Sequence, residues 1–119
     1  MDEKMRAFLR LMKGAFFLAK LAHECSLDDE ESKRKEDKCS AMAYAAACLA
    51  KCSAAEAVYW TTPELEHEEI PDLFAKFDTF AQELLQDFST DHSRQWVDIE
   101  FSRLEECFND SVCSQRIPE

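Results

Sequence analysis

Apolar residues recur every three or four positions in long stretches of the chain, and this spacing is typical of α-helices that bury one face. The stretch 2–25 carries one such stripe, which consists of Phe8, Met12, Phe16, Ala19 and His23. The stretch 72–88 has the most regular pattern, formed by Leu73, Phe74, Phe77, Phe80, Ala81, Leu84, Leu85 and Phe88. The stretch 92–114 has a similar stripe of Val97, Phe101, Leu104, Phe108 and Val112. Each stretch therefore predicts a helix.

The segment 38–59 is also predicted to be helical, but its composition differs. From Cys39 to Trp60 there are nine alanines, three cysteines and two serines, and only Lys51 and Glu56 are charged. Two apolar stripes compete along it, one of Met42, Ala46, Leu49 and Ser53 and one of Ala41, Ala45, Cys48, Cys52, Ala55 and Tyr59. Because an apolar face needs a cover, we expect neighbours around nearly all of this helix, from the chain itself or from another chain.

Breaks between these segments set the expected fold. Thr62 and Pro63 suit the N-cap and first position of a helix. Pro71 disfavours helical geometry at the preceding residue, so we expect a short helix at 63–69 and a restart after the proline. The charged residues 26–37 are expected to form a mobile connection. The prediction is an all-α, antiparallel four-helix bundle in a single domain, 1–119, with its third helix broken near Pro71.

Composition and charge narrow the classes of function. The chain has one glycine, which removes the usual glycine-rich nucleotide loops. The net charge is −11, and residues 61–119 hold all of it, with 15 acidic and 4 basic residues. Such a charge opposes direct binding of nucleic acid, which requires lysines and arginines against phosphates, and it favours a partner with a basic surface.

Cysteine usage and the N-terminus indicate the compartment. Six cysteines in 119 residues are too few for a secreted disulfide scaffold, and the first residues lack the apolar core of a signal peptide. We also expect no membrane-spanning segment. These features predict a cytoplasmic protein with free thiols.

The densest charge in the chain is a run of five acids in nine residues without a base. These are Glu64, Glu66, Glu68, Glu69 and Asp72. Carboxylates within one Debye length, about 8 Å at physiological salt, act together on an approaching cation. This run is therefore the predicted partner-binding site.

Two patterns could carry metal or thiol chemistry. Cys48 and Cys52 lie one helical turn apart and could supply two ligands to zinc, but structural zinc sites have two such pairs. Glu64 and His67 form half of a di-iron motif that bundles use twice, and the second half is missing. We therefore predict no catalytic residue, metal or cofactor, and no enzymatic activity.

The sequence leaves three hypotheses of function. The first is a small acidic interaction module or inhibitor that binds a basic surface of a partner protein, in a sharper version a nucleic-acid-binding protein whose phosphates the acids imitate. The second is a structural homo-oligomer that uses the small-residue helix 39–60 as its shared face. The third is a metal- or thiol-dependent site at Cys48 and Cys52. The first two predict a homodimer or a hetero-complex.

Overall fold

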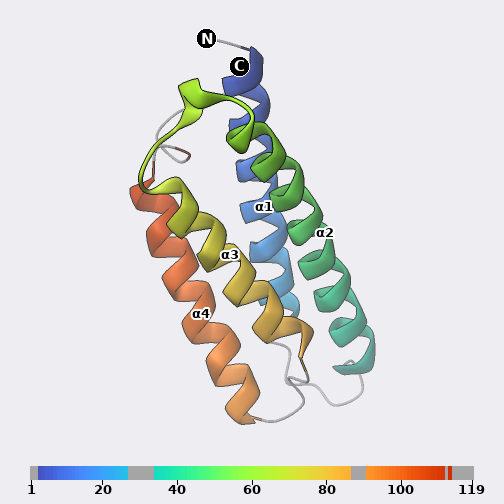
Figure 1. Cartoon of the computed structure of the whole chain (residues 1–119). Helices are drawn as coiled ribbons and strands as arrows, with labels where there is room; N and C mark the ends of the chain where they lie inside the picture. Colours follow the sequence, from blue (N-terminus) through green and yellow to red (C-terminus); the bar gives the residue numbers. More distant parts are fainter. Residues whose placement is uncertain (1–2, 27–33, 87–90, 112, 114–119) are drawn as a thin grey trace.

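A computed structural model describes residues 3–26, 34–86, 91–111 and 113. These residues form helices, and no strand occurs among them; the elements are α1 (Glu3–Ser26), α2 (Arg34–Trp60), the 3₁₀ helix η1 (Pro63–Leu65), α3 (Ile70–Leu85) and α4 (Asp91–Asp110). In Figure 1 the chain runs down α1, up α2, down α3 and up α4. The prediction of an all-α helical bundle is confirmed.

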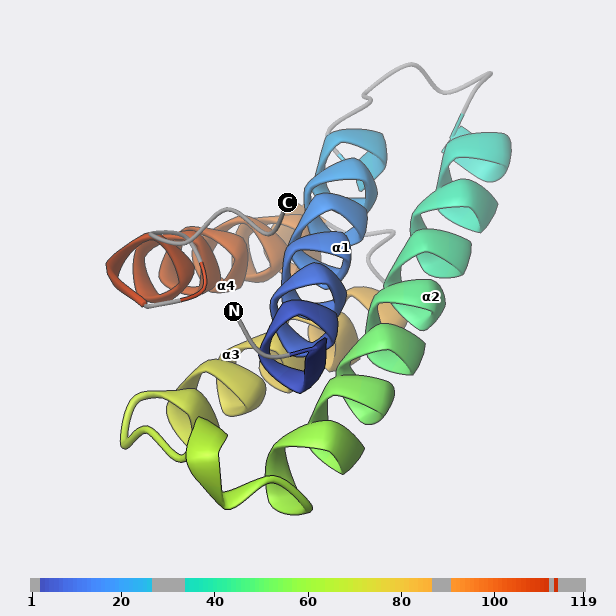
Figure 2. The same cartoon turned by 90° about the horizontal axis from the view of Figure 1, so that it is seen from above.

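The four long helices are not equivalent neighbours. The most extensive packing is between α1 and α2, followed by α3 with α4 and α2 with α3. Seen from above, α1 lies between α2 and α4 (Figure 2). As a result, α2 is a peripheral helix with packing partners on one side, which leaves its other side open.

One of the two stripes predicted on α2 forms its buried face. This stripe consists of Ala41, Ala45, Cys48, Cys52, Ala55 and Tyr59, all of which are buried. Of the competing stripe, Met42 and Leu49 are half-buried, and Ala46 and Ser53 are exposed. The small buried side chains let α1 come close, while Phe8, Phe77 and Phe80 from α1 and α3 fill the core. Within the described residues the chain therefore covers only one side of α2, and cover of its other side would have to come from another chain.

The third helix begins differently from the prediction. Only Pro63–Leu65 is helical in the segment 63–69, and α3 starts at Ile70, with Pro71 inside its first turn. A proline is tolerated there because the first N–H groups of a helix have no partner within the helix. The hydroxyl of Tyr59 donates to the carbonyl of His67 at 3.2 Å and accepts its N–H at 3.3 Å. These two bonds hold the segment as a loop.

The other helix ends shift as well. Helix α1 includes Ser26 and α2 begins at Arg34, so the predicted connection 26–37 is helical at both ends; residues 27–33 lie outside the described part of the chain. Helix α4 ends at Asp110, and residue 114, the predicted end, lies outside the described part of the chain. The Ser111 hydroxyl donates to the Phe108 carbonyl at 2.6 Å and accepts the Cys113 N–H at 3.2 Å, which closes the helix end.

Candidate functional site

The predicted acidic run lies where α2 connects to α3, on η1 and the loop that follows. Glu64, Glu66 and Glu68 are exposed, and Leu65 between them is buried. The buried Leu65 and the two Tyr59–His67 hydrogen bonds anchor this loop to the bundle. The three carboxylates therefore stand on an ordered support. We call these three residues the acidic loop.

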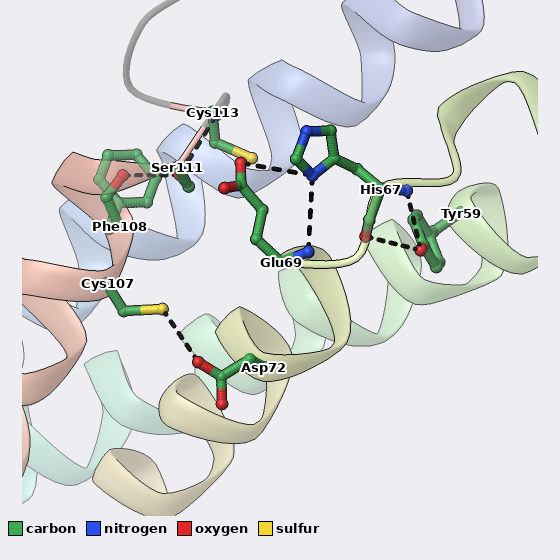
Figure 3. A network of polar contacts seen from close by, with 8 residues as sticks. All are labelled: Tyr59, His67, Glu69, Asp72, Cys107, Phe108, Ser111 and Cys113. Atoms are coloured by element: carbon green, nitrogen blue, oxygen red, sulfur yellow. Dashed lines mark hydrogen bonds and ion pairs between the residues drawn. The ribbon is translucent and has the colours of Figure 1, made fainter.

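The other two acids of the run differ from the acidic loop because they have polar partners, although Asp72 is exposed and Glu69 is half-buried. The carboxylate of Glu69 lies 3.7 Å from His67 Nδ1, and its backbone N–H donates to the same nitrogen at 3.5 Å. Asp72 lies 3.7 Å from Lys76 Nζ and accepts a hydrogen bond from Cys107 Sγ, also at 3.7 Å (Figure 3). The five predicted residues are thus divided between the acidic loop and a second surface that faces α4.

This second surface is an open groove of about 370 Å³ between the start of α3 and the end of α4. Its lining consists of Glu69, Asp72, Lys76, Arg103, Glu106, Cys107 and Asp110. Four acids against two bases give it a negative balance. Burial raises the pKa of the Cys107 thiol, and the Asp72 carboxylate adds to this rise. The thiol is therefore kept protonated as a hydrogen-bond donor and is a poor nucleophile.

Sequence reasoning did not find the contribution of α4 to this groove. Arg103, Glu106, Cys107 and Asp110 follow the helical spacing of three, four and seven residues, so a periodicity signal was present. Nothing in the sequence placed that face of α4 beside Asp72, because the contact joins residues 35 positions apart.

The cysteine pair on α2 belongs to the core. Cys48 and Cys52 are both buried, in one hydrophobic cluster with residues of α1 and α3. The pKa of Cys52 is raised by its hydrogen bond to Cys48 and by burial. Among the described residues, no group of three or more His, Cys, Asp or Glu side chains is arranged to hold a metal ion. The surroundings of this pair therefore favour packing over metal or thiol chemistry.

His23 and His67 could have added metal ligands to the Cys48 and Cys52 pair, but both contact other residues. His23 Nε2 lies 2.8 Å from an Asp98 oxygen, and its ring stacks on Phe101 at a centroid distance of 4.2 Å. His67 is held in the loop between α2 and α3, where it contacts Glu69. The His23 ring is thus packed against α4, whereas the His67 ring is exposed on the loop.

The outward side of α2 carries a row of exposed residues without charge. Its centre is a stripe of exposed small residues at alternating spacings of four and three, consisting of Cys39, Ala43, Ala46, Ala50, Ser53 and Ala57. We call this stripe the outer face of α2. The side chain of Lys51 lies over Gly14 of α1, so its charge is turned away from the stripe. Contiguous exposed apolar surface on a protein often marks an interface.

This helix also bears on the expectation that the chain has no membrane-spanning segment. Cys39–Trp60 is long and apolar enough to do so by length and composition, and 28 % of its most apolar window is buried in the bundle. The buried helices of soluble proteins share this property, so it does not by itself assign the helix to a membrane.

No protein-family model, curated protein or solved structure gave a significant match to this chain. Its function must therefore be inferred from its own surfaces.

Proposed function

We propose that this protein is a small cytosolic interaction module or inhibitor that binds a basic surface of a partner protein through the acidic loop. The observation that carries the proposal is the exposure of Glu64, Glu66 and Glu68 on an anchored loop. None of the three forms an ion pair or side-chain hydrogen bond within the described part of the chain. A site for a cationic partner needs carboxylates in this unneutralised state.

The charge distribution supports the same proposal. All three carboxylates fall within five residues of the chain. Charges separated by no more than about one Debye length act together, so we expect the loop to attract a basic surface as a single patch. Such a patch accelerates association and selects partners by complementarity. The groove that contains Glu69 and Asp72 extends the negative surface toward α4. A nucleic-acid-binding protein is the sharper proposal for the partner, because its phosphate-binding lysines and arginines accept carboxylates in place of phosphates.

The test is affinity capture with three forms of the full chain. One is the wild type, and one carries Glu64→Lys, Glu66→Lys and Glu68→Lys. The matched control carries Glu24→Lys, Asp78→Lys and Glu83→Lys, which changes the net charge equally at positions outside the loop. Captured proteins should be basic, should bind wild type and control, and should be lost with the loop variant. Capture that is equal for all three forms contradicts the proposal.

A second candidate function is a homo-oligomer built on the outer face of α2. The observation that favours it is that six consecutive positions of this stripe carry neither a charge nor a large side chain. Small residues let two helices approach closely along their whole length. Introducing a charge by Ala50→Glu should then convert an oligomer into a monomer in light scattering. A wild-type protein that is already monomeric, or an oligomer that Ala50→Glu leaves intact, argues against it.

A further inference from the structure

A second groove of about 290 Å³ lies between the middle of α1 and the end of α4. Its lining consists of Lys13, Phe16, Phe17, Lys20 and Phe108. Phe16 stacks on Phe108 with a centroid distance of 4.3 Å and an interplanar angle of 6°, which makes an aromatic floor. Phe17 beside it is 60 % exposed. The groove is thus an aromatic surface left open to solvent.

Its charge is opposite to that of the rest of the molecule. Lys13 precedes Phe17 by four residues and Lys20 follows it by three, so both ammonium groups flank the exposed ring on successive turns of α1. Neither lysine has an ion pair within the described part of the chain. In a protein with a net charge of −11, this groove is a local positive site with an apolar centre.

The same chain carries a surface with the complementary pattern. Trp60, the last residue of α2, is 66 % exposed, the highest value among the large apolar side chains described. Glu56 precedes it by four residues and Glu64 follows by four, and both are exposed. The ring of Tyr59 meets Trp60 edge to face at 4.8 Å, which orients the indole. Acids therefore stand on both sides of Trp60 along the chain, Glu56 one turn earlier on α2 and Glu64 on η1 beyond the end of the helix.

We propose that Trp60 of one copy of this chain docks in the groove around Phe17 of a second copy, where Lys13 and Lys20 meet Glu56 and Glu64. One contact then covers the two most exposed aromatic side chains of the described structure. A cavity of about 290 Å³ lies at the small end of ligand-sized sites, which suits a single indole. Within one chain Trp60 stays exposed, so a Trp60 side chain that fills the groove belongs to another copy.

The strength of this association follows from its size. A buried aromatic side chain covers about 150–250 Å², and stable interfaces bury at least about 1,200 Å² in total. Even two reciprocal contacts of this kind fall below that value. We therefore expect a weak dimer with a dissociation constant in the micromolar range or above.

Trp60 itself is the probe for the test. In a Trp96→Phe background it is the remaining tryptophan of the chain, so its emission reports on docking alone. With rising protein concentration we expect a blue shift, reduced quenching by acrylamide and an increase of mass in sedimentation. The variant Lys13→Glu with Lys20→Glu should abolish all three changes, while Lys4→Glu with Lys51→Glu, which changes the net charge equally, should retain them.

A mixing experiment adds an independent arm. The Lys13→Glu, Lys20→Glu variant keeps an intact Trp60 region, and a Glu56→Lys, Glu64→Lys variant keeps an intact groove. Each alone should be monomeric, and the mixture should associate. Association that persists in either variant alone, or a wild type whose Trp60 stays exposed at every concentration, overturns the proposal. Ala50→Glu should leave this association unchanged, which separates it from an oligomer through α2, and failure to capture a basic partner does not affect it.

Discussion

At the scale of single residues, Gly14 is a residue of low helix propensity in the interior of a helix. It lies in the middle of α1, where glycine costs about 1 kcal/mol relative to alanine. A Cβ at this position would meet the Lys51 side chain, with 3.0 Å to Cδ and 3.2 Å to Cε. Because these atoms belong to the end of a flexible chain, they can move aside at low cost. The glycine therefore does not mark a close contact between helix backbones.

We expect Gly14→Ala to raise the free energy of unfolding by about 0.5–1 kcal/mol. Urea unfolding of wild type and variant measures the difference. The control is Gly14→Ala in a Lys51→Ala background, where the contact is absent and the gain should be at least as large. A loss of stability in both backgrounds would show that something other than Lys51 limits the space.

Cys113 connects a buried thiol to the pH dependence of stability. Burial raises its pKa from 9.0 to about 11, a rise that the Ser111 hydrogen bond opposes. Above pH 9 the unfolded chain releases this proton while the folded chain retains it, so stability falls as the pH rises toward 11. Each unit of pKa difference corresponds to about 1.4 kcal/mol.

The difference in unfolding free energy between wild type and Cys113→Ala isolates this thiol. This difference should be constant below pH 9. Between pH 9 and pH 11 the wild type should lose about 2–3 kcal/mol of unfolding free energy relative to Cys113→Ala. Urea unfolding at several pH values measures it. A difference that stays constant up to pH 11 would mean that the folded thiol ionises as readily as the unfolded one.

At the scale of elements, α2 separates its two apolar stripes into an inner and an outer side. Ala45 is fully buried and Ala46 is exposed, although they are neighbours in the sequence. We expect Ala45→Leu to destabilise the protein by about 1–3 kcal/mol, because the close packing against α1 has no room for three more carbons. Ala46→Leu should change stability by about 0.5 kcal/mol or less. Thermal unfolding of both variants tests this, and equal effects would contradict the assigned inner face.

Periodicity predicted the helices well where one face only is apolar. The stripe of α3 contains Leu73, Phe77 and Phe80, all buried as expected. Periodicity could not show which of the two stripes on α2 is buried, because alanine, cysteine and serine fit a core and a surface equally well. The start of α3 was mispredicted for a tertiary reason, since the Tyr59 hydroxyl holds His67 outside a helix from a distance of eight residues.

At the scale of the whole molecule, the sequence indicated the acidic loop and the small-residue helix α2 as candidate surfaces. It did not indicate the two grooves that α4 helps to form. The exposure of the acidic loop followed from its charge density. The division of the run, with Asp72 bonded to Cys107, depends on how α3 and α4 pack and had no local signal. The groove around Phe17 was missed for a similar reason, because the stripe predicted for α1 included Phe16 but not Phe17, and no local signal placed Phe108 of α4 beside them. Phe17 itself is 60 % exposed.

The acidic loop and Asp72 have different surroundings, so we expect opposite changes in stability when their charges are removed. Glu64, Glu66 and Glu68 lack partners in the described structure and repel one another. Glu64→Gln, Glu66→Gln and Glu68→Gln together should therefore leave stability unchanged or raise it by up to about 1 kcal/mol at low salt. Added salt should remove this gain, because it screens the repulsion in the wild type.

Asp72→Asn is the matched control for that triple variant. Asp72 accepts the Cys107 hydrogen bond and lies beside Lys76, so neutralising it should lower stability by a few tenths of a kcal/mol to about 1 kcal/mol. Urea unfolding at low and high salt compares both variants with the wild type. If the acids of the loop are retained for recognition, their removal costs binding and not stability. A triple variant that is less stable than Asp72→Asn would give the loop carboxylates a structural role and remove the main support for a binding site there.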